Sequence, residues 1–231
     1  MIKAILFDFN GVIIDDERIQ MRAYMEVLKD FGVELTEDEY FSSLGMDDKS
    51  FVRNAFERKG RVASADEVDE VRAKKSDRWR NLIDGNIPLF RGVENLIASC
   101  SKEFPIGIVS MSKRADIEFV LEQTGLNRFF SHITSAENVT NHKPDPECYR
   151  VGFEGISISF KDTTSHKLLP GETLVIEDAP QGILAALGAG LRPMGVANTV
   201  SSSRLREAGA EIVANGLSGW TPITFKTLFS D

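Results

Sequence analysis

Cysteine and long apolar runs are both scarce in this sequence of 231 residues. The two cysteines, Cys100 and Cys148, form no close metal-binding pair, and a chain of this length does not need a disulfide to fold. No run approaches the roughly 18 apolar residues that a membrane span requires. The apolar start, MIKAILFDF, is too short for a secretory signal. These absences predict a cytoplasmic protein with reduced thiols and no membrane partner.

An excess of basic residues is also lacking, since the formal net charge is -8. Proteins that bind nucleic acids usually present a basic face, so the charge argues against a nucleic-acid partner. A local basic pocket for a small phosphate is still compatible with this balance. The hydrophobic fraction of 42% and the charged fraction of 27% are ordinary for a globular protein. The sequence leaves the oligomeric state open, and a monomer is compatible with it.

Apolar runs that alternate with helical patterns predict the core of the fold. Residues 2–7 form an almost continuous apolar run, which is typical of a buried parallel strand. Further strands are expected at residues 105–109, 132–135, 173–176 and 192–197, with helices between them. This alternation predicts an α/β fold with a doubly wound parallel sheet, a Rossmann-like core. The Ser/Thr-rich segment 156–169 is expected to be a loop.

A helical stretch interrupts this alternation after the first strand. Residues 16–31 place apolar side chains at a helical period, and residues 36–83 continue as charged helical pieces with no strand pattern. We therefore expect a core formed by residues 1–14 and 85–231, and an inserted α-helical cap domain formed by residues 15–84.

Polar residues follow three of the expected strands. Asp8 ends the first strand, Ser110 follows the strand at 105–109, and the pair Glu177-Asp178 follows the strand at 173–176. Ligands bind at the carboxyl ends of strands in doubly wound sheets, so these side chains are expected to converge. Carboxylates with a hard cation such as Mg²⁺ can hold a phosphate, and a carboxylate can attack phosphorus.

A basic residue is expected at the same edge of the sheet. Lys143 precedes Asp145 and Pro146, which suit the cap and the first turn of a helix. Helix N-termini favour anions, and the ammonium group would balance negative charge on a transferring phosphoryl group. Each of these residues alone has an ordinary structural explanation, so their joint order and spacing is the stronger signal.

Four motifs in order resemble the haloacid dehalogenase-like superfamily. They are DFNGV at 8–12, Ser110, KPDP at 143–146 and EDAPQG at 177–182. The sequence is most similar to the branch that holds β-phosphoglucomutase and small-sugar-phosphate phosphatases. The resemblance covers almost the whole chain, including the helical insertion.

The resemblance implies a magnesium site. Asp8 would be both the nucleophile and a Mg²⁺ ligand, and the backbone carbonyl of Asn10 would be a second ligand. Asp178 would complete the protein ligands, with Glu177 close by or bridging through water.

The resemblance also implies a phosphate and substrate pocket. Ser110 would bind the phosphate, and Lys143 would bridge the phosphate and Asp8. Gly11 would shape the loop beside the substrate, and Ser112 is a further candidate contact. The partner would be a small phosphorylated metabolite.

The first motif departs from the family pattern at Asn10, where the family normally has an aspartate. In phosphatases and mutases that aspartate protonates the leaving oxygen and later activates water. An amide cannot exchange a proton in this way, and losing a general acid-base typically costs about 10²–10⁴-fold in rate. Three explanations stay open: lost activity, a substrate with a good leaving group, or a proton donor supplied by the cap or the substrate.

The helical insertion departs from the family as well, because Gln20 stands where the branch often has histidine. This departure argues against a β-phosphoglucomutase-like phosphotransferase, although Gln20 remains a candidate substrate contact. Residues 44–49 resemble the substrate-specificity loop, with Gly45 and Lys49 as candidate contacts.

The leading hypothesis is therefore a magnesium-dependent phosphohydrolase of a small metabolite that uses an aspartyl-phosphate intermediate. A phosphonate hydrolase is an alternative, which would need Lys49 to form a Schiff base. A true dehalogenase fits less well, because its chemistry does not require a metal and phosphate site. A non-catalytic module that binds a phosphate ligand is an alternative from another class.

Overall fold

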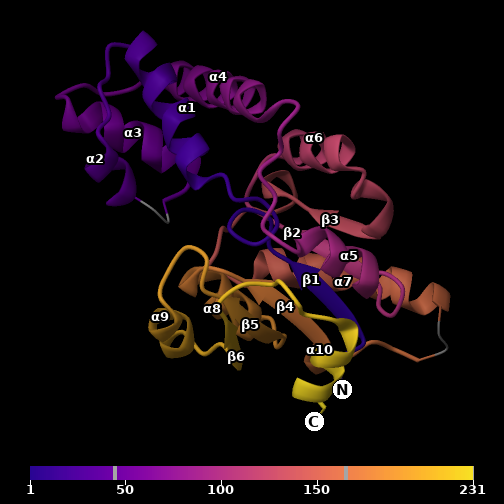
Figure 1. The fold of residues 1–231 in the computed structure, drawn as a ribbon. Coiled ribbons are helices and arrows are strands. Elements are labelled where there is room, and N and C mark those ends of the chain that lie inside the picture. The colour runs from indigo at the N-terminus through magenta and orange to yellow at the C-terminus, as the bar shows by residue number, and fades with distance from the viewer. Residues whose placement is uncertain (44–45, 164–165, 231) are drawn as a thin grey trace. The chain divides into compact units, whose positions relative to one another are not determined.

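The computed structural model describes residues 1–43, 46–163 and 166–230 (Figure 1). The chain divides into two compact units, one formed by Met1–Asp15 with Pro88–Asp231 and the other by Asp16–Ile87. Among the helices of the described ranges, none has both the length and the apolar composition needed to cross a membrane.

The first unit is built on a parallel sheet. Its strands are β1 (Ala4–Phe7), β2 (Ile106–Val109), β3 (His132–Thr134), β4 (Thr173–Glu177), β5 (Arg192–Val196) and β6 (Ile212–Ala214). Their order is β3-β2-β1-β4-β5-β6, and every neighbouring pair is parallel. This order is that of a doubly wound sheet, which confirms the predicted fold class. From β1 the chain first adds β2 and β3 on one side and then β4, β5 and β6 on the other, so the topological switch point lies between β1 and β4. Asp8 directly follows β1.

Helices cover both faces of this sheet, and all four residues of β1 are buried as a result. The helices of the unit are α5 (Val93–Cys100), α6 (Arg114–Thr124), α7 (Glu147–Thr163), α8 (Pro180–Gly188), α9 (Ser202–Glu207) and α10 (Pro222–Leu228). Leu6 of β1 belongs to an apolar cluster with Ile156 of α7 and Ala185 of α8. Successive strand residues point to opposite faces of the sheet, so Phe7 lies on the face opposite Leu6. There its ring packs edge-to-face with that of Phe130.

The structure corrects one expectation about secondary structure and adds two elements that the sequence did not predict. The segment expected as a loop from residue 156 continues α7 as far as Thr163. Ile156 and Phe160 of this segment are buried, while Ile158 is exposed on the other side of the helix. The Ser157 hydroxyl donates within the helix to the carbonyl oxygen of Phe153 at 2.6 Å. A polar composition therefore hid a helix that is apolar on one face. The short strand β6 and helix α10 were not anticipated.

The second unit is helical over its described residues. Its helices are α1 (Glu17–Asp30), α2 (Glu37–Phe41), α3 (Asp48–Arg58) and α4 (Ala65–Ile83). Polar residues mark several helix starts, as at Ser64, whose side chain accepts from the backbone of Glu67 while the Glu67 carboxylate accepts from Ser64. The unit has its own apolar core, which includes Val27, Phe56 and Val71.

Candidate functional site

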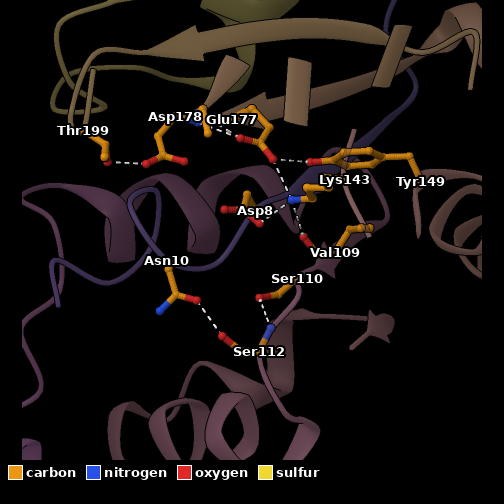
Figure 2. A network of polar contacts seen from close by, with 11 residues as sticks. Asp8, Asn10, Val109, Ser110, Ser112, Lys143, Tyr149, Glu177, Asp178 and Thr199 are labelled. Carbon is orange, nitrogen blue, oxygen red and sulfur yellow. Dashed lines mark hydrogen bonds and ion pairs between the residues drawn. The ribbon is translucent and has the colours of Figure 1, made fainter. Parts of the chain in front are cut away.

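The polar residues that follow β1, β2 and β4 meet at one edge of the sheet (Figure 2). Phe7 of β1 pairs with Ile176 of β4, so Asp8 and Glu177 emerge side by side. Asp8, Ser110, Glu177 and Asp178 are all buried, although each carries a polar side chain. Burying polar groups is costly unless they are paired, so their gathering at this edge points to a functional site.

Lys143 is the ammonium partner of this site. Its Nζ atom lies 2.7 Å from Asp8 Oδ1 and 2.6 Å from Glu177 Oε1, and its side chain is 11% exposed. It stands just before α7, where the Asp145 side chain accepts from the backbone N–H of Glu147 at 2.9 Å. The helix begins at Glu147, one residue later than the expected first-turn Pro146. Burial alone would lower the pKa of Lys143, but the carboxylates of Asp8 and Glu177 raise it well above the usual value.

Glu177 is fully engaged within the protein. Its Oε1 atom accepts from Lys143 and from the Tyr149 hydroxyl at 3.0 Å. Its Oε2 atom accepts from the backbone N–H groups of Asp178 and Ala179 at 3.0 and 3.1 Å. A carboxylate offers about four acceptor positions, and four donors occupy those of Glu177. Its contacts therefore orient Lys143 and the strand end rather than leave an oxygen open for a cation.

The carboxylates fit a divalent cation. One oxygen each from Asp8, Glu177 and Asp178 lies within 4.8 Å of the others. Three carboxylates face the single ammonium of Lys143, so the ionised cluster carries excess negative charge. Oxygen ligands of this kind suit Mg²⁺ or Ca²⁺. Asp8 and Asp178 are the side chains that would hold the ion, since the hydrogen bonds of Glu177 are already made.

Burial and mutual repulsion change the acidity of these groups. Burial, and to a smaller degree the charge of Glu177, raise the pKa of Asp8 to about 7 against the lowering effect of Lys143. Burial also raises the pKa of Asp178 well above its usual value, and the charges of Glu177 and Asp8 act in the same direction. Without a cation, the cluster therefore holds protons near neutral pH that a bound cation would displace.

We expect Mg²⁺ affinity to increase with pH between about 6 and 8, because binding requires ionised Asp8 and Asp178. The pKa of Asp8, about 7, means that the ionised fraction of this group grows as pH rises through this window, and the raised pKa of Asp178 acts in the same direction. Calorimetric titration at several pH values, in buffers of different ionisation enthalpy, measures both affinity and proton release. A pH-independent affinity with no proton release would contradict this cause.

Two glycines let the backbone approach the carboxylates. Gly11 has φ +75°, and a Cβ there would lie 1.8 Å from Asp178 Oδ2. A Cβ at Gly182 would lie 1.7 Å from Glu177 Oε1. Both positions therefore require glycine for space, and Gly11 also requires it for its left-handed conformation.

Gly11→Ala is expected to lower the free energy of unfolding by more than the roughly 1–2 kcal/mol of a left-handed alanine, and to weaken Mg²⁺ binding. The methyl group would displace the Asp178 carboxylate. Gly125→Ala is the matched control, because Gly125 has φ +68° and no atom lies within 4 Å of its added Cβ. Denaturant unfolding and Mg²⁺ titration of both variants test this. Equal effects of the two substitutions would show that space at Gly11 does not matter.

The structure brings Asn10, Ser110 and Ser112 together beside the carboxylates. The Ser112 hydroxyl donates to Asn10 Oδ1 at 2.6 Å, and the Ser112 backbone N–H donates to Ser110 Oγ at 3.0 Å. Figure 2 shows the Asn10 amide turned toward Ser112. The Asn10 oxygen thus accepts a hydrogen bond, which fixes the orientation of the amide. Unlike a carboxyl group, this amide cannot act as a general acid or base.

The remaining candidate contacts belong to the helical unit. Gln20 donates from Nε2 to Asp16 Oδ2 at 2.6 Å, so its amide is held partly within that unit. Lys49 lies in the first turn of α3, where its backbone N–H donates to Asp47 Oδ1 at 3.0 Å. Gly45 lies outside the described residues.

Three residues that contribute to the site, Tyr149, Asn198 and Thr199, were not predicted from the sequence. Tyr149 donates to Glu177 from a fully buried position on α7, where an aromatic residue is indistinguishable from core. Thr199 donates its hydroxyl to Asp178 Oδ2, and Asn198 donates its amide to the carbonyl oxygen of Gly11 at 2.7 Å. Both follow β5, so the strand-end rule that identified Asp8 would have found them had it been applied to this strand.

A family model described as haloacid dehalogenase-like hydrolase matches residues 5–196. Protein SUPPRESSOR OF QUENCHING 1 of Arabidopsis thaliana is 28% identical over 227 residues, which cover 94% of this chain but only 20% of that protein. The phosphorylated carbohydrates phosphatase of Thermotoga maritima is 25% identical over 211 residues, which cover 90% of this chain and 92% of that one. A crystal structure of a haloacid dehalogenase family hydrolase from Entamoeba histolytica has a TM-score of 0.82 at 24% identity and covers 100% of both chains, which shows the shared fold.

Proposed function

This chain belongs to the haloacid dehalogenase-like hydrolases, and from that premise we propose that it hydrolyses a small phosphorylated metabolite, with Asp8 as nucleophile and Mg²⁺ as cofactor. The observation that carries the proposal is the cluster at the sheet edge, where Lys143 pairs with Asp8 and Glu177 while Asp178 lies within reach of both carboxylates. The phosphatase activity named for the Thermotoga maritima relative supports the substrate class.

In this proposal an oxygen of Asp8 attacks phosphorus, and the bond to the leaving oxygen breaks. Water then attacks the aspartyl phosphate, which releases inorganic phosphate and restores the carboxylate. Lys143 holds Asp8 in place and offsets negative charge on the phosphoryl group, while the Ser110 hydroxyl donates to a phosphate oxygen. Asp8, the backbone carbonyl of Asn10 and Asp178 would hold Mg²⁺, which would supply charge neutralisation for the phosphoryl group.

Asn10 limits the substrates that such a site turns over. The leaving oxygen gains no proton from the amide, so groups that depart as stable anions are favoured. We expect this chain to turn over acyl and aryl phosphates at least about 10²-fold faster than alkyl phosphates. An enzyme with an acid at this position would show a smaller difference. Phosphate release from acetyl phosphate, p-nitrophenyl phosphate and glycerol phosphate, with Mg²⁺ or with chelator, tests this. Equally fast turnover of all three would contradict the role given to Asn10.

We propose that the helical unit Asp16–Ile87 acts as the cap that selects the substrate. Gln20, Gly45 and Lys49 are its candidate contacts, by resemblance to the family. Substitution of Gln20 or Lys49 by alanine should then change KM for the best substrate. The same substitutions should have less effect on kcat for acetyl phosphate, because this small molecule offers few groups for a cap to bind.

A binding module is the second candidate, and the held amide of Asn10 favours it. Such a module would accept a phosphoryl group or its mimic at Asp8 without releasing phosphate. Stoichiometric labelling of Asp8 with no turnover would favour the module. Catalytic phosphate release that is lost in Asp8→Asn would favour the enzyme.

A further inference from the structure

The loop after β5 contacts the Asp178 carboxylate and the turn after β1 that carries Asn10, although none of its residues belongs to the four motifs. β5 pairs with β4 through Gly195 and Glu177, so the residues that follow it emerge beside Asp178. Two consecutive side chains of this loop, Asn198 and Thr199, reach toward the site. Thr199 contacts the Asp178 carboxylate, a proposed Mg²⁺ ligand, and Asn198 contacts the carbonyl oxygen of Gly11, the residue after Asn10.

The Thr199 hydroxyl donates to Oδ2 of Asp178 (Figure 2). In that view Thr199 lies on the side of the Asp178 carboxylate away from Lys143. A hydroxyl bound to one carboxylate oxygen fixes the rotation of the group and leaves the other oxygen available to a cation. Partners of this kind, which hold a ligand rather than the metal, typically change metal affinity by about 10–100-fold.

The same loop fixes the turn that carries Asn10. The Asn198 amide donates to the carbonyl oxygen of Gly11 at 2.7 Å. An added Cβ at Gly11 would lie 1.8 Å from Asp178 Oδ2 and 2.9 Å from Thr199 Oγ1, so the turn packs directly against this pair. Asn198 and Thr199 thus set the spacing between the turn after β1 and the carboxylate after β4.

We propose that Thr199 is a positioning residue for the proposed cation site: its hydroxyl orients Asp178, and Asn198 holds the Gly11 turn against it. This inference rests on the proposed function, because it needs Asp178 to be a metal ligand. Thr199 is itself exposed, so its role is not to fill the core, and its substitution opens no buried cavity.

Titration of Mg²⁺ into the chain of 231 residues, followed by calorimetry and by the metal-dependent rise in melting temperature, tests the proposal. Thr199→Val keeps the shape but removes the hydroxyl, and it should weaken Mg²⁺ binding about 10–100-fold. Thr199→Ser keeps the hydroxyl and should bind Mg²⁺ within about threefold of the wild type. Asn198→Ala should also weaken Mg²⁺ binding. Ser201→Ala is the control in the same loop, because the hydroxyl of Ser201 makes a hydrogen bond to that of Ser203 and not to the site, within the described residues.

The outcomes separate this inference from the function on which it rests. Normal Mg²⁺ binding by both the wild type and Thr199→Val would overturn the role of Thr199 and leave the proposed function intact. Equal weakening in Thr199→Val and Thr199→Ser would also overturn it, since the hydroxyl would then not be the cause. Failure of the wild type to bind Mg²⁺ would overturn the metal-dependent function and this inference together.

Discussion

Asn10→Asp is expected to raise the rate of phosphate release from alkyl phosphates by about 10²–10⁴-fold, which corresponds to about 3–5 kcal/mol of barrier. The substitution supplies a carboxyl group that can protonate the leaving oxygen and then take a proton from water. Its geometry is already prepared, because the Ser112 hydroxyl donates to the oxygen that the two side chains share. Initial rates with glycerol phosphate and Mg²⁺, for the wild type and the variant, measure the gain.

The control for this gain is Asn10→Ala, which removes the amide without adding an acid and should show no increase. Acetyl phosphate provides a second comparison for the step that phosphorylates Asp8, because its leaving group needs little protonation and the gain in the rate of that step should be much smaller. A new pH dependence should accompany the gain in Asn10→Asp, since the added carboxyl must change its protonation state during turnover. No increase with any alkyl phosphate would contradict the explanation that a missing acid-base limits this site.

Asp8→Asn should abolish phosphate release, with a loss on the order of 10⁴-fold or more for every substrate that the wild type turns over. An amide is a poor nucleophile toward phosphorus, and it cannot serve as an anionic ligand for Mg²⁺. The fold should persist, because Lys143 keeps its ion pair with the buried Glu177. Phosphate release, Mg²⁺ titration and thermal unfolding of the variant measure these three effects separately.

Asp15→Asn is a matched control, since Asp15 is an exposed carboxylate close to Asp8 in the sequence. It should leave both activity and Mg²⁺ binding unchanged. Residual activity above about one hundredth of the wild-type rate in Asp8→Asn would contradict covalent catalysis by this residue.

The sheet was predictable because its strands are buried on both faces. Such strands appear as continuous apolar runs, as in residues 2–7, and the polar residues that follow them mark one edge of the sheet. This is why Asp8 and Glu177 could be placed together from residues far apart in the sequence. Strand β6 has three residues, of which only the last is buried, but the predicted strand β3 shares both features, so length and burial alone do not explain why β6 was missed.

The network around the site was less predictable, because it depends on which side chains meet. Glu177 could be identified as acidic, but its four donors become evident only in three dimensions. Tyr149 carries no pattern that separates it from core residues, whereas Thr199 follows β5 and lies where the strand-end rule expects site residues. The extension of α7 was missed because serine side chains can bond to their own helix, as Ser157 does.

Crystals grown with Mg²⁺ and beryllofluoride, a mimic of a phosphoryl group, would test the catalytic role of the sheet edge most directly. We expect a beryllium–oxygen bond to Asp8, with Mg²⁺ about 2.1 Å from oxygens of Asp8 and Asp178 and from the backbone carbonyl of Asn10. A mimic bound elsewhere, or an ion shared by neither Asp8 nor Asp178, would contradict the proposed mechanism.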